Sequence, residues 1–138
     1  MKVLAIILIV IVVLAILYFL MIMPRRANKP DTACYKEWVY AHRGLHDNAT
    51  QAPENSMAAF RKAVDAGFGI ELDIQLTKDK IPVVFHDFTL KRVCGGEGKI
   101  CDYTYEELQQ FHLCESTEKI PKFEDVLKMV EGKVPLIV

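Results

Sequence analysis

The chain has 138 residues, a formal net charge of −1 at pH 7 and a hydrophobic fraction of 51%. A net charge this close to zero gives no support for nucleic-acid binding, which depends on a basic surface. Four scattered cysteines are no disulfide framework, although Cys94 and Cys101 could close a small loop in an oxidising compartment. Composition therefore disfavours a nucleic-acid-binding protein and a disulfide-stabilised scaffold.

The first predicted element is the apolar run at residues 3–23, which contains no charge, proline or glycine. A helix needs about 20 apolar residues to cross the hydrocarbon core of a membrane. A cleavable signal peptide is the alternative, but its apolar region is usually about 7 to 15 residues long and ends at a small-residue cleavage site. Neither feature occurs here, so we predict an uncleaved transmembrane anchor over residues 1–23, followed by a linker over residues 24–37.

Basic residues on either side of this run predict its orientation. Lys2 precedes the run, and four basic residues follow it, namely Arg25, Arg26, Lys29 and Lys36. Positively charged flanks tend to stay in the cytoplasm. We therefore expect a single-pass protein of the cell membrane with its soluble region in the cytoplasm, although the even number of cysteines leans weakly the other way.

The soluble part begins with a predicted strand, loop and helix. The stretch "WVYAHRG" at residues 38–44 is β-prone and ends on glycine, which is typical of a buried strand leading into a loop. Asn55 or Ser56 can cap the helix that follows, and Gly67 is its expected C-terminal stop.

A β-hairpin is predicted next, because the segment between "ELDIQLT" and "IPVVFHD" is too short for a parallel crossover. With a two-residue turn at residues 79–80, Ile74 would pair with Phe85 on an apolar, half-buried face. On the other face, His86 would lie opposite Asp73. The hairpin would thus bring a histidine to the carboxylates.

Two helices and a strand complete the predicted elements. Thr104 and Glu107 can form a capping box at the start of a short helix. A second helix carries an apolar stripe within residues 123–130 and ends at Gly132. The final stretch "KVPLIV" predicts the start of a further strand.

Glu71 and Asp73 are the first candidate site residues. They lie two apart on a predicted strand, so their side chains share one face. Converging carboxylates suit hard cations such as Mg²⁺ or Ca²⁺. The alternative is a solvent-facing row of acids on an antiparallel sheet, which is the commoner arrangement for such a pair taken alone.

Two histidines and an arginine favour a functional site over a solvent-facing row of acids. His42 and Arg43 end a predicted strand, which is where the sites of α/β proteins gather. His42 and His86 could carry protons, and Arg43 could bind a phosphate through its planar fork of donors. By contrast, His46 and His112 are predicted to be ordinary surface or core residues.

Seven motifs follow one another from residue 40 to the C-terminus. They are "HRG", "PENS", "ELDIQLTKD", "VVFHD", "TLKR", "DYTYEEL" and "IPKFEDVL". This ordered series resembles the glycerophosphodiester phosphodiesterase family. The resemblance implies an α/β fold, with residues 38–138 forming the N-terminal part of a TIM (β/α)8 barrel whose site lies at the C-terminal ends of its strands.

The resemblance also implies a role for each candidate residue. His42 and His86 match the family's pair of acid/base histidines, and Arg43 matches the arginine that holds the phosphate. Glu71 and Asp73 match two ligands of a divalent metal, commonly Ca²⁺ or Mg²⁺.

Glu54, in the "PENS" motif, matches a loop acid near the family's site. The implied reaction is hydrolysis of a glycerophosphodiester to glycerol 3-phosphate and an alcohol. The implied partners are this small-molecule substrate and, through the N-terminal helix, a membrane.

The chain departs from the family pattern in two respects. Ser56 replaces the commoner threonine but keeps the hydroxyl. The family also supplies a third metal-binding glutamate after the strand that begins here as "VPLIV", whereas Val138 is the last residue. Because a full barrel has roughly 250 residues, we expect an N-terminal fragment that is poorly stable and inactive on its own.

Two other functions remain open from the sequence. The chain could be a non-catalytic remnant that serves as a binding module at the membrane. It could also be a related phosphodiesterase acting on another phospholipid head group.

Overall fold

The computed structural model describes residues 2–24 and 31–138, which fall into two units, Met1–Thr32 and Ala33–Val138. The first unit contains helix α1 (Lys2–Ile22), none of whose residues is buried. By length and composition α1 could cross a membrane, and a signal sequence would satisfy the same criteria. The predicted linker falls partly on residues 25–30, which lie outside the described residues.

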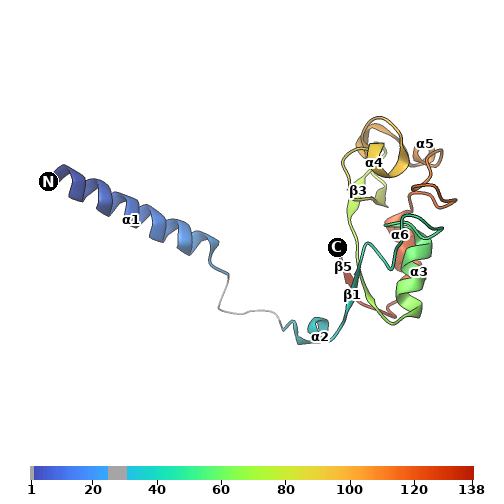
Figure 1. The fold of residues 1–138 in the computed structure, drawn as a ribbon, viewed down its shortest axis with the longest axis horizontal. Helices are drawn as coiled ribbons and strands as arrows, with labels where there is room; N and C mark the ends of the chain where they lie inside the picture. The colour runs from blue at the N-terminus through green and yellow to red at the C-terminus, as the bar shows by residue number, and fades with distance from the viewer. Residues whose placement is uncertain (1, 25–30) are drawn as a thin grey trace. The chain divides into compact units, whose positions relative to one another are not determined.

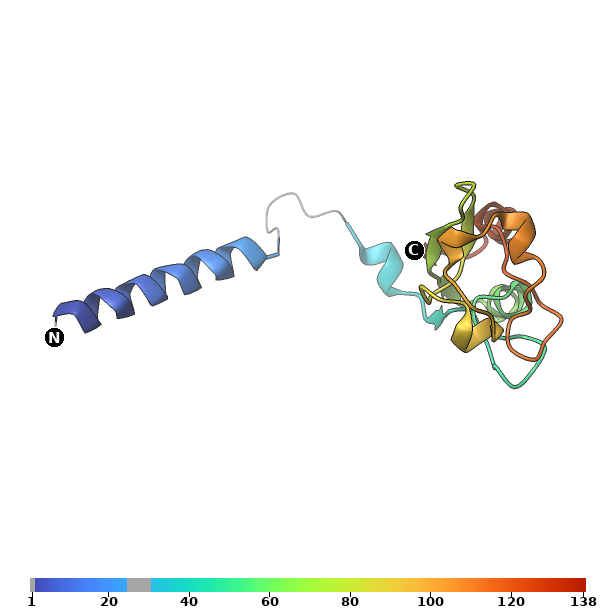
Figure 2. The same ribbon diagram turned by 90° about the horizontal axis from the view of Figure 1, so that it is seen from above.

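The second unit combines short helices with two small sheets (Figures 1 and 2). Strands β1, β2 and β5 form a parallel sheet in the order β1-β2-β5, and β3 and β4 form an antiparallel pair. The elements in chain order are α2 (Ala33–Lys36), β1 (Tyr40–His42), α3 (Met57–Asp65), β2 (Gly69–Glu71), β3 (Ile74–Leu76), β4 (Pro82–Val84), α4 (Lys91–Cys94), a 3-10 helix (Ile100–Asp102), α5 (Tyr105–Leu108), α6 (Phe123–Val130) and β5 (Leu136–Ile137).

Helix α3 connects the parallel strands β1 and β2, as predicted, and α6 precedes β5. Helices α3 and α6 lie side by side on one side of the strands (Figures 1 and 2) and contact each other. The register pairs His42 with Glu71, and Glu71 in turn with Ile137. The polar residues at the ends of β1 and β2 are therefore brought level with each other.

The predicted helix starts are confirmed. Ser56 caps α3, because its side chain accepts a hydrogen bond from the backbone N–H of Ala59 at 3.1 Å. Thr104 and Glu107 form the expected capping box at the start of α5. These short polar side chains satisfy backbone groups that have no partner within the helix.

Gly44 allows the loop after β1 to pass close to α3. Its φ is +85°, and a Cβ atom at this position would lie 2.9 Å from Ala59 Cβ and 2.9 Å from Phe60 Cδ1. Both the backbone conformation and the lack of space require glycine. The "HRG" motif thus ends on a residue that fixes the path of the chain beside the site.

The antiparallel pair has a different register from the predicted one. Ile74 pairs with Val84 rather than with Phe85. The backbone N–H of Phe85 donates to the carbonyl of Asp73 at 2.9 Å, so His86 does not lie opposite Asp73. The prediction was wrong by one residue.

The reason lies in the hairpin loop, which has three residues rather than two. Thr77 N–H donates to the carbonyl of Ile81 at 3.1 Å, leaving residues 78–80 as the loop. Lys80 has a φ of 66°. A turn followed by one left-handed residue is the usual form of three-residue hairpin loops, and a lysine gives little warning of it.

Two hydrophobic clusters form the core, and β4 contributes to both. Val84 belongs to the cluster between the parallel sheet and helices α3 and α6, whereas Val83 belongs to the cluster under the segment 85–120. Successive side chains of a strand point to opposite faces, which allows this division. The apolar face predicted for β3 is not packed, since Ile74 and Leu76 are 43% and 51% exposed.

Candidate functional site

The first part of the site lies where β1 and β2 end. His42 Nε2 is 3.8 Å from Glu71 Oε2, and the side chains are 69% and 30% exposed, respectively. The parallel register accounts for this proximity, because His42 and Glu71 are paired residues. The structure therefore brings together two of the residues that the sequence singled out.

Arg43 follows β1 in a left-handed backbone conformation, with a φ of 58°. Its backbone N–H donates to the carbonyl of Glu71 at 2.8 Å, and its carbonyl accepts from Asn55 N–H at 3.0 Å. Its side chain donates from NH1 to Glu54 Oε1 at 2.8 Å. Such conformations cost a non-glycine residue about 1 to 3 kcal/mol and gather at functional sites.

Glu54 is 4% exposed, and both of its carboxylate oxygens accept hydrogen bonds. Arg92 donates to Oε1 at 2.7 Å and to Oε2 at 2.9 Å, while Asn48 donates to Oε2 at 3.0 Å. Hydrogen bonds from Arg92 are the main reason that the pKa of Glu54 falls from 4.5 to about 2. With Arg43 as a further donor, the four acceptor positions of this carboxylate are all in use.

His86 and Asp87 follow β4 and continue the same chain of contacts. Arg92 donates from Nε to Asp87 Oδ2 at 2.7 Å and from NH2 to Asp87 Oδ1 at 2.8 Å. These bonds hold the pKa of Asp87 well below its usual range. Asp87 Oδ1 lies 2.6 Å from His86 Nδ1. An ionised carboxylate only accepts, so Nδ1 carries a proton, and Nε2 makes no hydrogen bond among the described residues.

Gln75 fixes the backbone that carries these two residues. Its Nε2 lies 3.1 Å from the carbonyl oxygens of Phe85 and His86, and 2.6 Å from that of Asp87. A side chain of β3 thus satisfies carbonyls of the segment that leaves β4. The position of His86 therefore depends on the hairpin, although not through the register predicted for it.

We refer to the connected side chains Arg43, Glu54, Arg92, Asp87 and His86 as the arginine network. In the sequence, Arg92 stands out only as part of the "TLKR" motif, and no role was predicted for Arg92, Asn48 or Gln75. That motif was the one signal for Arg92, because an arginine on a short polar segment otherwise resembles a surface residue.

Glu71 and Asp73 have few hydrogen bonds by comparison. Asp73 Oδ2 is buried and has no hydrogen-bond partner among the residues that the structure describes. Arg43 Nε is 3.8 Å from this oxygen and Arg43 N is 3.4 Å from Glu71 Oε2. A buried carboxylate oxygen without a partner is costly, and a hard cation would satisfy it.

The carboxylates fit two ligands of such a cation but do not form a complete site. In residues 2–24 and 31–138, no group of three or more His, Cys, Asp or Glu side chains is arranged to hold a metal ion. Glu54 cannot serve as a further ligand, because all its acceptor positions are occupied. The donor types of the pair suit two ligands of a divalent cation, and the described residues do not complete a site around them.

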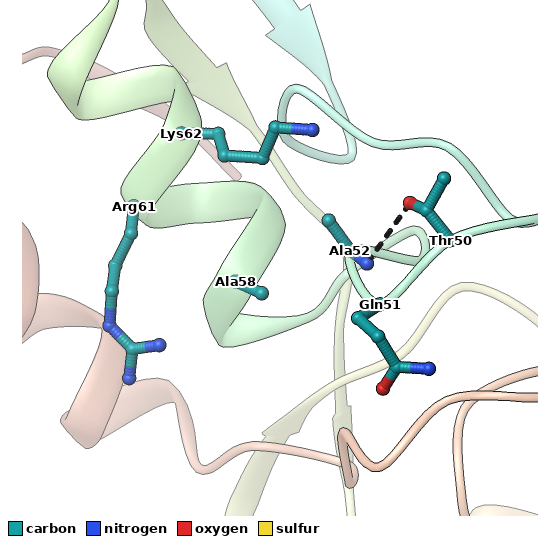
Figure 3. A pocket seen from close by; sticks show the side chains of 6 residues that line it. All are labelled: Thr50, Gln51, Ala52, Ala58, Arg61 and Lys62. Carbon is teal, nitrogen blue, oxygen red and sulfur yellow. Dashed lines mark hydrogen bonds between the residues drawn. The ribbon is translucent and has the colours of Figure 1, made fainter.

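A separate surface pocket of about 460 Å³ lies between the loop after β1 and helix α3 (Figure 3). Figure 3 shows Lys62 extending toward the loop and Arg61 pointing away from the loop. The residues that line the pocket are Thr50, Gln51, Ala52, Ala58, Arg61 and Lys62. None of them belongs to the candidate site, which lies at the C-terminal ends of β1 and β2.

Comparison with known proteins gives one consistent result. The model of the glycerophosphoryl diester phosphodiesterase family matches residues 42–137. A glycerophosphodiester phosphodiesterase from Caldanaerobacter subterraneus is 42% identical over 105 residues, which are 71% of this chain and 42% of that protein.

Solved structures agree in fold. A glycerophosphoryl diester phosphodiesterase from Parabacteroides distasonis has a TM-score of 0.65 and 38% identity, over 72% of this chain and 36% of that chain. A phosphodiesterase from Oleispira antarctica, solved in complex with the product sn-glycerol-3-phosphate, has a TM-score of 0.64 and 32% identity, over 74% of this chain and 44% of that chain. The expected fold, the N-terminal part of a TIM barrel, is therefore confirmed. The chain spans less than half the length of these relatives.

Proposed function

Because this chain belongs to the glycerophosphoryl diester phosphodiesterase family, we propose that residues 38–138 supply the first part of a barrel that hydrolyses glycerophosphodiesters. The products would be glycerol 3-phosphate and an alcohol. The observation that carries this proposal is the convergence of His42, Arg43 and the Glu71 carboxylate at the ends of two parallel strands. The product bound to the Oleispira antarctica relative supports the choice of substrate class.

Arg43 would bind the phosphate of the substrate. Its NH1 group is held by Glu54, and its backbone is held by Glu71 and Asn55. A guanidinium fixed in this way offers donors to phosphoryl oxygens at little further entropic cost. Glu54 would act as a fixed negative charge that positions Arg43, rather than as a proton carrier.

His42 and His86 would move the protons. One would accept a proton from the attacking oxygen, and the other would donate a proton to the alcohol oxygen as its bond to phosphorus breaks. His86 is suited to either task, because Asp87 holds the proton on Nδ1 and leaves Nε2 free. His42, with a side chain that is 69% exposed, would need the bound substrate to complete its surroundings.

Glu71 and Asp73 would hold a divalent cation, Ca²⁺ or Mg²⁺, together with ligands from elsewhere. The buried Asp73 Oδ2, which has no hydrogen-bond partner among the described residues, supports this assignment. When bound, such a cation offsets the negative charge that develops on phosphoryl oxygens.

Residues 1–23 would anchor the protein in the membrane, with residues 24–37 as a linker and residues 38–138 as the catalytic domain on the cytoplasmic side. The length and apolar composition of α1 support the anchor. A protease added outside intact cells should not cleave an epitope at the C-terminus. Cleavage of that epitope would contradict the cytoplasmic orientation.

A chimaeric barrel tests the proposed reaction. Residues 38–138 would replace the matching segment of the Caldanaerobacter subterraneus relative, and release of glycerol 3-phosphate from glycerophosphocholine would be measured with Ca²⁺, with Mg²⁺ and with EDTA. We expect metal-dependent release that falls about 10² to 10⁴-fold in His86→Ala. His112→Ala is the matched control, because His112 is exposed and lies outside the site.

Each alternative has its own outcome in this experiment. A folded chimaera that binds Ca²⁺ but releases no glycerol 3-phosphate would favour a binding module. Release of phosphocholine or a cyclic phosphate would favour a different phosphodiesterase reaction. Residues 1–138 alone should show less than about 1% of the chimaera's turnover, because Glu71 and Asp73 provide only part of a metal site; equal turnover would contradict this expectation.

A further inference from the structure

We propose that Arg92 is a positioning residue that holds Asp87, and through it His86, in the orientation needed for proton transfer, while joining His86 to the phosphate-binding Arg43. This inference rests on the proposed function. It concerns a residue for which the sequence provided no role.

The position of Arg92 is fixed by its short helix. Leu90, two residues before Arg92, and Val93, directly after it, are 0% and 4% exposed and belong to the second hydrophobic cluster. With these two side chains anchored, α4 presents Arg92 to the loops after β1 and β4. Arg92 is therefore held by packing from one side and by ion pairs from the other.

A single guanidinium here binds two carboxylates in a bidentate manner. NH1 and NH2 donate to the two oxygens of Glu54, while Nε and NH2 donate to the two oxygens of Asp87. Fork-to-fork pairing of this kind fixes angles as well as distances. Lysine has one nitrogen on a flexible stem, so it cannot replace this geometry.

The two carboxylates depend on Arg92 to different degrees. Glu54 would keep Arg43 and Asn48 as donors if Arg92 were removed. Asp87 would lose both hydrogen bonds from Arg92, and within the described residues its side chain would keep only the contact with His86 Nδ1. Loss of Arg92 should therefore disturb His86 strongly and Arg43 weakly.

This asymmetry predicts a specific kinetic signature. In the chimaera, Arg92→Ala should lower kcat about 10²-fold, because displacement of a proton-transfer group by even 1 Å has effects of that size. KM should change by less than about 3-fold, because phosphate binding through Arg43 is retained. Arg92→Lys should not restore kcat, whereas an interaction that needed only a positive charge would be restored.

A direct test uses the ring nitrogens of His86 and requires no turnover. Residues 1–138 labelled with ¹⁵N-histidine would be studied in detergent micelles by NMR, at a pH where His86 is neutral. We expect the Nδ1–H tautomer in the wild-type chain. In Arg92→Ala and Arg92→Lys, at least about half of this population should shift to the Nε2–H tautomer, which is the commoner form of free histidine.

Lys91→Ala is the matched control, since Lys91 is the exposed neighbour of Arg92 on the same helix. Circular dichroism would establish that each variant is folded. If Arg92→Ala does not fold, Arg92→Gln takes its place, because it keeps most of the stem and removes the charged fork. An unchanged His86 tautomer in a folded Arg92 variant would overturn the proposal. If the tautomer shifts in the Arg92 variants but the chimaera with the wild-type segment is inactive, only the proposed function is overturned.

Discussion

The two sides of the candidate site differ in how far their polar groups are satisfied. In the arginine network, Glu54 and Asp87 accept hydrogen bonds on both carboxylate oxygens. On the other side, Asp73 Oδ2 is buried without a hydrogen-bond partner among the described residues, and Glu71 is partly exposed. The carboxylates on one side are fully hydrogen-bonded, and the other side leaves a buried carboxylate oxygen without a hydrogen bond in the described structure.

This difference predicts that the arginine network stabilises the fold, whereas the buried Asp73 oxygen lowers its stability. A fully paired network of bidentate hydrogen bonds holds its members in one geometry before any ligand binds. Asp73 Oδ2 has an ion pair with Arg43 Nε at 3.8 Å but no hydrogen bond among the described residues, and a buried oxygen of this kind is costly until a cation or donor binds to it. Substitutions on the two sides of the site should therefore differ in their effects on stability and on turnover.

Asp73→Asn should remove function without removing stability. In the chimaeric barrel, we expect kcat/KM to fall about 10³-fold, because the neutral amide is a poor ligand for a hard divalent cation. The free energy of unfolding in EDTA should change by less than about 1 kcal/mol, because the replaced oxygen makes no hydrogen bond in the described structure. Turnover would be measured with Ca²⁺ and with Mg²⁺, and unfolding with urea.

The matched control for this variant is Asp125→Asn, which alters an exposed acid in the first turn of α6. It should leave turnover unchanged. A marked loss of stability in Asp73→Asn would mean that Asp73 already has a strong partner, and full activity would mean that it is not a metal ligand.

Glu54→Gln should lower stability in a manner that depends on pH. The pKa of Glu54 is about 2 in the folded chain, well below its usual 4.5. A lowered folded-state pKa contributes stability that is fully present above pH 4.5 and is lost as the pH falls toward 2. The variant should therefore be about 2 to 3 kcal/mol less stable than the wild-type chain at pH 7, and the gap should close toward pH 2.

Urea unfolding of both proteins at several pH values between 2 and 7 measures this gap directly. Other titrating groups are common to both chains, so they largely cancel in the difference. A gap that stays constant with pH would show that the loss comes from packing rather than from the charge of Glu54.

The sequence predicts those parts of the molecule that depend on local chemistry. Asn55 or Ser56 was predicted to cap α3, and Thr104 to cap α5, because short polar side chains before a helical repeat favour capping; Ser56 and Thr104 are the caps. The resemblance placed His42 and Glu71 at a site on the C-terminal ends of the strands, and the register of β1 and β2 shows them paired.

Features that depend on distant contacts were not predicted. The hairpin register was wrong because Lys80 adopts a left-handed conformation that its sequence does not announce. Arg92 and Gln75 were missed because long polar side chains acquire a role only when the fold brings acceptors to them. Arg92 reaches Glu54 across 38 positions of the chain, and no local pattern predicts such a contact.

Glu124→Gln provides the smallest expected effect and the sharpest contrast with Glu54→Gln. Glu124 forms an ion pair with Lys128 at 2.6 Å on the surface of α6, where the two side chains are 69% and 67% exposed. Water and salt screen such a pair, and holding two long side chains together costs entropy. We therefore expect the same midpoint of urea unfolding as in the wild-type chain, at low and at high salt. If Glu124→Gln destabilised the chain as much as Glu54→Gln does, burial and bidentate pairing would not be what distinguishes the arginine network from an ordinary surface ion pair.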